Sequence, residues 1–337
     1  LVPDADLSVV NFATLPVDGS RYLIETAPPI HYLSTERDVA RATRPISSTE
    51  SLLAMGGADF DASPDRAARR RNSRSDEPVA YRGPTSGCED MRSLRFLDLP
   101  GTRKEIDAIS ALWRSRSSPR SESTTSIARR IGSKADEASF KTLAPRHTAL
   151  HVATHGFYLD ESCRGDSGAV VGDLDGPTTS TLDRESYVES LARENPLVLS
   201  GLVLAGANNR GTAPPRGEDG ILTAEEIASL DLTRVRLAVL SACASGEGPV
   251  VSGEGVLGLR RAFALAGVDT LVTSLWPVGD DWTVRWMTAF YRARFDGSTL
   301  VESTRQAGLQ VLRDLRADGQ PTHPFFWGGF IAIGDWR

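Results

Sequence analysis

Two short segments carry side chains that could act together in nucleophilic chemistry. His155 and Gly156 follow the apolar run over 148–154, and Cys243 follows the apolar run over 235–241. A thiol becomes a nucleophile when a base removes its proton, and imidazole is the usual base in proteins. The backbone N–H groups of Gly156 and Cys243 could then stabilise an oxyanion, and a glycine lets a substrate backbone approach closely. The pair predicts acyl transfer in which Cys243 attacks a carbonyl and His155 protonates the leaving group.

Each of these residues also has an ordinary structural interpretation. A single cysteine at a strand end is most often a small buried hydrophobe, and a single histidine is most often a hydrogen-bonded structural residue. The competing histidines are His31, His147, His151 and His323. Of these, His151 would share one face of its strand with His155 but lie deeper. Ser241 is an alternative nucleophile that should also lie deeper than Cys243.

The expected strands that end at His155 and Cys243 belong to a chain in which apolar strands alternate with amphipathic helices. Apolar runs that predict strands lie over 51–55, 148–154, 202–204, 235–241, 270–275 and 329–333. Helices are expected from Thr102, Ser133 and Thr223 onward and over 256–266, 284–291 and 308–315. This alternation predicts an α/β fold with a mostly parallel central sheet covered by helices on both faces. In such sheets active sites gather at the carboxyl ends of the strands, so the sheet could bring His155 and Cys243 together.

Local signals indicate where three of the helices begin or end. Thr102 with Glu105, and Thr223 with Glu226, have the spacing of capping boxes. Gly267 follows an apolar stripe and predicts a helix that ends on a left-handed residue.

Three other segments have a different character. Residues 1–50 predict a strand-rich segment of short strands and turns, including a strand over 22–24. Two long polar segments, about 58–93 and 160–195, predict mobile loops because they lack apolar periodicity. The first loop contains an arginine-rich stretch over 69–74, which becomes a candidate self-processing site if the enzyme favours basic residues.

Composition excludes several classes of protein. The net charge of −6 argues against a nucleic-acid partner bound through phosphates. The three cysteines, Cys88, Cys163 and Cys243, form neither a disulfide framework nor a metal-ligand pattern, so we expect no metal and a reducing, cytoplasmic location. The longest apolar stretch, 197–207, is too short for a membrane span of about 20 residues. We therefore expect no membrane association.

A glycine pattern at 253–258 (GEGVLG) fits a dinucleotide-binding fingerprint but lies in the wrong place for one. It follows the apolar run over 235–241 only after about eleven residues, and Glu254 would place a negative charge where a pyrophosphate should bind. We therefore expect no nucleotide or other cofactor. These glycines would instead let a helix pack closely on the sheet.

Several longer stretches resemble one known family, the CHAT family. They are 150–156 (LHVATHG), 199–202 (LSGL), 204–208 (LAGAN), 220–227 (GILTAEEI), 240–243 (LSAC), 271–278 (LVTSLWPV) and 323–330 (HPFFWGGF). The stretch over 1–37 also resembles the opening of the family, and the order of the motifs is the family's order. CHAT domains are caspase-like peptidases that often follow tetratricopeptide repeats. The departures lie in the two long loops.

The resemblance implies a caspase-like three-layer α/β/α sandwich. Residues 1–50 would be its N-terminal segment and residues 51–337 its peptidase core. It also implies a His155–Cys243 dyad with Gly156 in the oxyanion hole, and therefore a thiol endopeptidase that cleaves protein substrates. The alternative is a catalytically inactive adaptor that uses the fold for protein binding.

Two further expectations concern specificity and regulation. In separase-like relatives an acidic residue near the 276–281 turn (WPVGDD) helps to hold a basic residue before the scissile bond. Asp280 and then Asp281 are the matching residues here, although either could instead N-cap a helix beginning near Trp282. The chain begins at Leu1 without methionine, so we expect a fragment whose upstream domains are missing. The resemblance implies that a tetratricopeptide-repeat or sensor module lies there in the full-length protein.

Overall fold

The computed structural model describes most of the chain but omits several segments. The described residues are 1–34, 50–62, 95–116, 126–158, 196–212, 217–242, 250–251, 255–256 and 258–335. Cys243, the expected loop over 160–195 and the arginine-rich stretch over 69–74 lie outside these residues.

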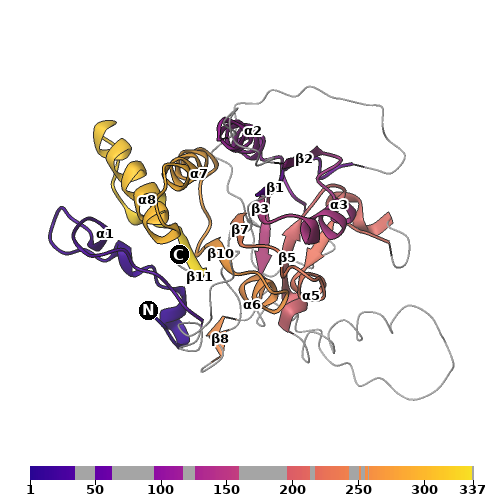
Figure 1. Cartoon of the computed structure of the whole chain (residues 1–337), viewed down its shortest axis with the longest axis horizontal. Helices are drawn as coiled ribbons and strands as arrows, with labels where there is room; N and C mark the ends of the chain where they lie inside the picture. The colour runs from indigo at the N-terminus through magenta and orange to yellow at the C-terminus, as the bar shows by residue number, and fades with distance from the viewer. Residues whose placement is uncertain are drawn as a thin grey trace, which may run out of the picture.

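A six-stranded sheet forms the centre of the molecule (Figure 1). The strands, in spatial order, are β11 (Phe330–Gly334), β10 (Thr270–Ser274), β7 (Leu237–Ser241), β3 (Ala149–Ala153), β1 (Ser51–Ala58) and β2 (Ser126–Gly132). All neighbours are parallel except β10 and β11. The inner strands β1, β3, β7 and β10 are almost entirely buried, because helices cover both faces of the sheet.

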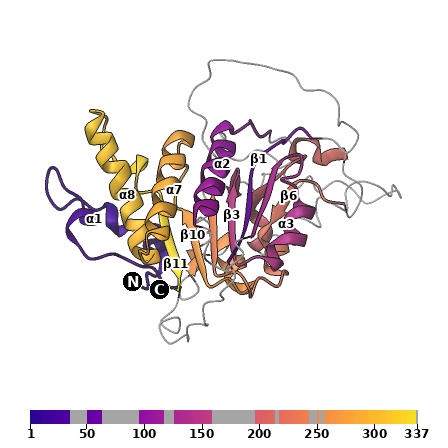
Figure 2. The same cartoon turned by 45° about the horizontal axis from the view of Figure 1, so that its top comes forward.

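The helices divide into two layers, one on each face of the sheet (Figures 1 and 2). One layer comprises α2 (Pro100–Ser115), α7 (Asp280–Phe295) and α8 (Leu300–Ala317). The other comprises α3 (Glu137–Leu143), α5 (Ala224–Ala228) and α6 (Leu259–Leu265). Alternate residues of β3 enter the two cores, so that Leu150 and Val152 face α3, α5 and α6, whereas Ala149 and Ala153 face α2, α7 and α8. The prediction of a three-layer α/β fold is confirmed.

A smaller antiparallel sheet continues from the end of β3. It contains β4 (Gly156–Tyr158), β5 (Ser200–Val203) and β6 (Ile221–Thr223), in that spatial order. A two-stranded ladder, β8 (Val250–Val251) with β9 (Gly255–Val256), precedes α6. The short helices η4 (Ala144–Arg146), η6 (Pro196–Leu199), η7 (Ala207–Thr212) and η8 (Pro324–Phe326) lie in the connections. The first residue of this smaller sheet is Gly156, one of the candidate site residues.

The N-terminal segment covers the β11 edge of the central sheet. Tyr32 forms an isolated bridge with Ile333, and Gly334 N donates to Tyr32 O at 3.2 Å. Residues 1–34 contain η1 (Ala5–Val9), η2 (Phe12–Thr14) and α1 (Leu23–Thr26). The strand expected over 22–24 is therefore wrong, because Leu23 and Ile24 begin this short helix.

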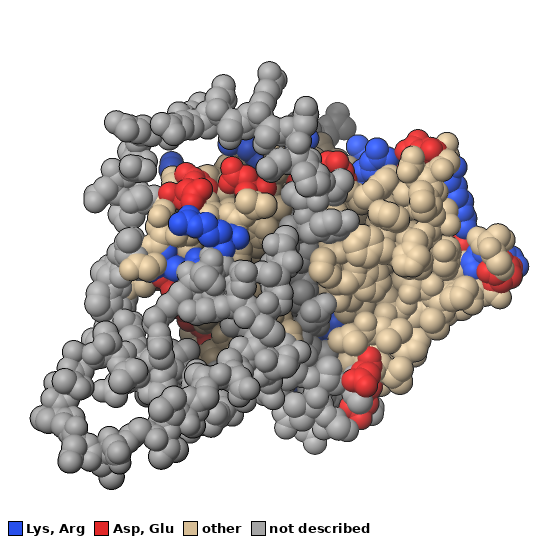
Figure 3. Space-filling view, turned by 180° about the vertical axis from the view of Figure 1, so that it is seen from behind, with Lys and Arg blue, Asp and Glu red and all other residues tan. Residues whose placement is uncertain are grey.

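Charged side chains are unevenly distributed over the surface. In Figure 3 a wide face on the right has few charges, on the side where Figure 1 places the N-terminal segment and α8. Among the described residues, five of the seven most exposed large apolar side chains belong to this segment: Leu1, Val2, Leu7, Leu15 and Val17. In the part of the chain that is described, no helix combines the length and apolarity needed to cross a membrane.

The helix-end predictions have mixed outcomes. The capping box of Thr223 and Glu226 at the start of α5 is confirmed, and Gly267, which follows the C-cap residue Ala266 of α6, has a left-handed φ of 97°. The box of Thr102 and Glu105 is wrong, because α2 begins earlier, at Pro100. Its Thr102 hydroxyl donates to Leu99 O and accepts from Gly57 N, while the Glu105 carboxylate contacts His151.

The first residues of the expected 58–93 loop are part of the folded core. Phe60 is 2% exposed, and Phe60 O accepts from Asn208 N at 2.9 Å. Asp59 O accepts from Gly206 N at 3.0 Å. The loop prediction is therefore wrong for residues 58–62, which attach the end of β1 to the segment after β5.

Candidate active site

The ends of β3 and β7 lie side by side at one edge of the central sheet. The two strands are parallel, with Ala153 opposite Ser241, and Thr154 N donates to Ser241 O at 3.2 Å. His155 and Cys243 each follow this pair by two residues. Neighbouring strands are about 4.8 Å apart. Two residues that lie the same number of positions after a pair of opposite residues therefore follow backbone that is adjacent in space. Of the two residues, the structure describes only His155.

His155 is enclosed by apolar side chains and held by one backbone carbonyl. It is 3% exposed, and its ring centroid lies 5.1 Å from that of Phe60 and 5.6 Å from that of Phe96. Its Nε2 lies 2.7 Å from Leu97 O. A carbonyl oxygen can only accept a hydrogen bond, so Nε2 must carry a proton. In the neutral ring Nδ1 then holds the lone pair and is the atom that can act as a base.

Gly156 begins β4 opposite Leu202 of β5. The neighbouring residue Val203 donates its N–H to His155 O at 3.0 Å. Since hydrogen-bonded and non-hydrogen-bonded pairs alternate along an antiparallel ladder, Gly156 and Leu202 form a non-hydrogen-bonded pair. The Gly156 N–H is therefore directed away from β5, as an oxyanion donor requires.

The alternative residues His151 and Ser241 lie inside the core. His151 is fully buried, with Nε2 2.7 Å from Glu105 Oε1 and Nδ1 3.1 Å from Tyr291 OH. Burial and the neighbouring Glu105 raise the pKa of Tyr291 well above its ordinary value. Ser241 is 0% exposed within β7. These positions fit structural roles better than chemistry on a substrate.

The remaining histidines bind nearby backbone groups. His147 Nδ1 lies 2.7 Å from Leu143 O, and His31 Nε2 lies 2.7 Å from Gly334 O. The His323 side chain accepts from Phe325 N at the start of η8. Each of these contacts gives its histidine a structural role.

Asp280 and Asp281 lie at the start of α7 but in different environments. Asp280 is 6% exposed and its Oδ2 accepts from Gly101 N, the second residue of α2, at 2.5 Å. Asp281 is exposed. Helix α7 begins at Asp280 with Gly279 as its N-cap, so the expectation that either aspartate N-caps a helix near Trp282 is wrong. Asp280 instead joins the N-termini of two helices.

Three other carboxylates lie near the segment that holds His155. Asp98 directly follows Leu97, and its pKa is raised by partial burial and by the negative charges of Asp59 and Asp61. Asp61 also accepts from Asn208 Nδ2 at 3.0 Å. Arg95 Nη1 lies 4.0 Å from Asp61 Oδ1, so the surface beside Leu97 carries both acidic and basic groups.

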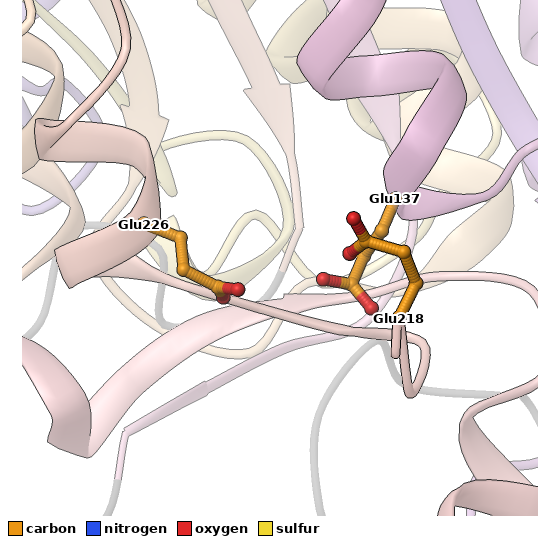
Figure 4. A group of neighbouring side chains, drawn as sticks. All are labelled: Glu137, Glu218 and Glu226. Carbon is orange, nitrogen blue, oxygen red and sulfur yellow. The ribbon is translucent and has the colours of Figure 1, made fainter. Parts of the chain in front are cut away.

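Among the described residues, one group of carboxylates lies close enough together to hold a metal ion (Figure 4). It consists of Glu137, Glu218 and Glu226. Lys141 Nζ donates to all three, at 3.1, 2.6 and 2.9 Å respectively. The lysine thus supplies the positive charge, and Glu137 Oε2 also accepts from Gly220 N at 2.7 Å just before β6. This cluster connects α3 to the smaller sheet.

Sequence reasoning missed the aromatic residues Phe60 and Phe96 that pack on His155, and also Leu97 and Asn208. Leu97 acts through its carbonyl, which every residue has, so no sequence signal distinguishes it. Asn208 holds the backbone of Phe96, the residue before Leu97. Its position in the stretch over 204–208 that resembles the family was the one available signal.

Two solved structures align with most of this chain at low sequence identity. The Arg-specific cysteine proteinase gingipain R is 8% identical, with a TM-score of 0.43 over 86% of this chain and 46% of the other. The complex of Porphyromonas gingivalis RgpB pro- and mature domains is 10% identical, with a TM-score of 0.40 over 86% and 47%.

Sequence relatives give a closer match over a shorter length. Tetratricopeptide repeat protein 28 of Mus musculus is 33% identical over 114 residues, which are 34% of this chain and 4% of that protein. The Homo sapiens protein of the same name is 32% identical over 120 residues, 36% of this chain and 5% of that protein. The chain thus spans a small part of these relatives. The family model of the CHAT domain matches residues 1–335, so the chain belongs to the CHAT domain family.

Proposed function

We propose that this CHAT domain is a caspase-like cysteine endopeptidase with His155 and Cys243 as its catalytic dyad. The observation that carries the proposal is the pairing of Ala153 with Ser241 on adjacent parallel strands. His155 follows Ala153 by two residues, and Cys243 follows Ser241 by two residues. The buried His155 ring, held in one tautomer by Leu97 O, supports it.

The mechanism follows from this tautomer. His155 Nδ1 takes the proton from Cys243 Sγ, and the thiolate attacks the peptide carbonyl carbon. The N–H groups of Gly156 and Cys243 stabilise the resulting oxyanion. As the C–N bond breaks, the Nδ1 proton passes to the departing amine, leaving a thioester on Cys243. His155 then takes a proton from water, and the water oxygen attacks the thioester carbon. The C–S bond breaks, which releases the Cys243 thiolate and the new carboxylic acid.

We further propose a preference for arginine or lysine before the cut. Three carboxylates near Leu97, those of Asp59, Asp61 and Asp98, support this preference, since a cationic side chain could pair with those that Arg95 does not already face. Asp280 and Asp281 are the residues for which the family resemblance proposes this role. An arginine facing a carboxylate can form two parallel hydrogen bonds that a neutral side chain cannot reproduce.

A peptide library derived from a proteome tests the activity and the preference together. The wild-type chain, Cys243→Ala and His155→Ala are each incubated with the library, and new termini are identified by mass spectrometry. We expect cleavage, mainly after arginine or lysine, with the wild type and none with either variant. Cleavage that survives Cys243→Ala would exclude this nucleophile.

Thiol reactivity separates the peptidase from an inactive adaptor even when no substrate in the library is cut. The rate of Cys243 alkylation by iodoacetamide is measured against pH, with the site identified by mass spectrometry. A thiolate paired with imidazolium stays reactive well below the ordinary cysteine pKa of about 8.5. We expect such low-pH reactivity, and we expect it to be lost in His155→Ala. Ordinary thiol behaviour in the wild type would favour the adaptor.

The setting of the domain is also a proposal. We propose a cytoplasmic protein in which the domain is regulated by an attached repeat module. The name of the matched relatives, tetratricopeptide repeat protein 28, supports association with tetratricopeptide repeats. Sequencing of the full-length transcript and fractionation of cells test these two points, and a full-length chain without repeats would contradict the first.

A further inference from the structure

Asn208, in η7, binds both backbone polar groups of a single residue in the segment over 95–99. Its Oδ1 accepts from Phe96 N at 2.9 Å, and its Nδ2 donates to Phe96 O at 3.0 Å. The same Nδ2 donates to Asp61 Oδ1 at 3.0 Å. Phe96 N can only donate and the Asp61 carboxylate can only accept, so these partners fix the orientation of the amide. The Asn208 side chain thus makes the two hydrogen bonds to the Phe96 backbone that a neighbouring strand would make.

Asn208 is itself held from the other side. Its backbone N donates to Phe60 O at 2.9 Å, directly after β1. The Phe60 and Phe96 rings lie 6.3 Å apart, and both also pack against the His155 ring. The asparagine therefore links the end of β1 to the segment that passes over His155.

The residue that this arrangement positions is Leu97. Its carbonyl accepts from His155 Nε2 at 2.7 Å, yet its side chain is 64% exposed and cannot anchor the residue by burial. The segment over 95–99 belongs to no helix or strand, so no regular backbone ladder holds it. The position of the Leu97 carbonyl therefore depends on its neighbours. On one side Leu99 is buried and its carbonyl is bound by Thr102, and on the other side Phe96 has a buried ring and a backbone bound by Asn208.

We infer that Asn208 is a positioning residue for His155, acting through Phe96 and the Leu97 carbonyl. The inference rests on the proposed peptidase function, which gives the tautomer its role. Without the amide, the Leu97 carbonyl is free to turn away from Nε2. The ring then exchanges between its two tautomers and rotates, so that Nδ1 is less often the base directed at Cys243. A displacement of about 1 Å in such a group can lower a rate by roughly 100-fold.

The test compares Asn208→Ala with Asn209→Ala. Asn209 is the matched control, because its Nδ2 donates to Asp61 O and Ala62 O rather than to Phe96. The chain has five histidines, so a ¹⁵N-histidine-labelled sample gives a simple spectrum, and His155→Ala assigns the signal of His155. We expect Nε2-protonated His155 in the wild type and in Asn209→Ala, and a mixture of tautomers in Asn208→Ala.

Peptide cleavage supplies the second measurement. For Asn208→Ala we expect kcat to fall by roughly 10- to 100-fold while KM changes less than about threefold, because the amide does not touch substrate. Should Asn208→Ala fail to fold, Asn208→Ser replaces it, since it adds no charge beside Asp61 and its single short hydroxyl cannot bind both Phe96 N and Phe96 O. The same tautomer mixture is expected.

The two readouts separate the two hypotheses. An unchanged tautomer with unchanged kcat in a folded Asn208 variant overturns the positioning role, whatever the wild type cleaves. A changed tautomer in an Asn208 variant, with neither cleavage nor low-pH reactivity of Cys243 in the wild type, supports the positioning role and overturns the proposed function. A kcat loss of equal size in Asn209→Ala would also overturn the positioning role of Asn208, since the loss would then come from a general disturbance of η7.

Discussion

Replacing Asp280 should weaken the fold, because this carboxylate joins the N-termini of two helices. It is the first residue of α7, and its Oδ2 accepts from the N–H of Gly101, the second residue of α2, at 2.5 Å. The first N–H groups of a helix have no partner within the helix and carry partial positive charge. Both groups are buried, so water competes weakly for this contact.

The expected magnitude follows from these contacts. A hydrogen bond to a charged group contributes about 1.5–3 kcal/mol, and a carboxylate at a helix N-terminus contributes roughly 0.3–1 kcal/mol more. Asp280→Asn keeps the shape and an acceptor but removes the charge, so it should cost about 1–2 kcal/mol. Asp280→Ala leaves the buried Gly101 N–H without this acceptor and should cost about 2–4 kcal/mol.

Urea unfolding followed by tryptophan fluorescence measures the effect. The exposed neighbour Asp281 is the matched control, and Asp281→Asn should change the free energy of unfolding by about 0.5 kcal/mol or less. The order expected from most to least stable is wild type with Asp281→Asn, then Asp280→Asn, then Asp280→Ala.

The same variants decide between a structural role and a role in specificity. If Asp280→Asn unfolds at the wild-type urea concentration and no longer prefers arginine or lysine, the structural reasoning is wrong and the carboxylate faces substrate. If stability falls while the preference for basic residues survives, Asp280 acts only at the helix ends.

Three further changes test other parts of the fold. Burial and the neighbouring Glu218 raise the pKa of Glu137 to about 8, from a value of 4.5 without these effects. Between pH 5 and 8 the folded state therefore keeps a proton on Glu137 that the unfolded state has lost. The free energy of unfolding should decline by roughly a few kcal/mol over this range as the pH rises. Glu137→Gln should remove this decline, as measured by thermal unfolding. Glu105→Ala leaves the fully buried His151 Nε2 without its carboxylate partner and should cost about 3–5 kcal/mol in urea unfolding. Gly56→Ala would place a Cβ 2.7 Å from Ile106 Cγ1 and should cost about 1–3 kcal/mol in the same assay.

Each of these predictions has a clear contradicting result. An equal decline with pH in Glu137→Gln would assign the titration to another group. A loss below about 1 kcal/mol in Glu105→Ala would show that its contact with His151 contributes little. Wild-type stability of Gly56→Ala would mean that α2 shifts freely away from β1.

The sequence by itself determined the elements whose signals are local. The continuous apolar runs over 148–154, 235–241 and 270–275 predict buried parallel strands, and β3, β7 and β10 lie there, because a strand covered on both faces must be apolar throughout. The Thr223–Glu226 box and Gly267 are likewise confirmed, since each acts within a few residues along the chain.

Tertiary structure decided which group a side chain bonds to wherever packing brought a partner from a distant part of the chain. Thr102 and Glu105 have the same spacing as Thr223 and Glu226, yet Glu105 contacts His151 of β3 instead of capping its own helix. Asp280 likewise turns from its own helix to Gly101 of α2. A buried carboxylate needs a strong donor, and sequence spacing does not reveal which donors the packing of helix on sheet brings near.

The candidate site shows the same division. The apolar runs ending before His155 and Cys243 made both residues candidates, because strand ends are where parallel sheets position chemistry. The alternation of side chains along β3 stops at Ala153, however, so sequence could not show that His155 packs on Phe60 and Phe96. Nor could it show which carbonyl meets Nε2. Every residue carries the same carbonyl group, and only the folded path of the chain over His155 selects that of Leu97.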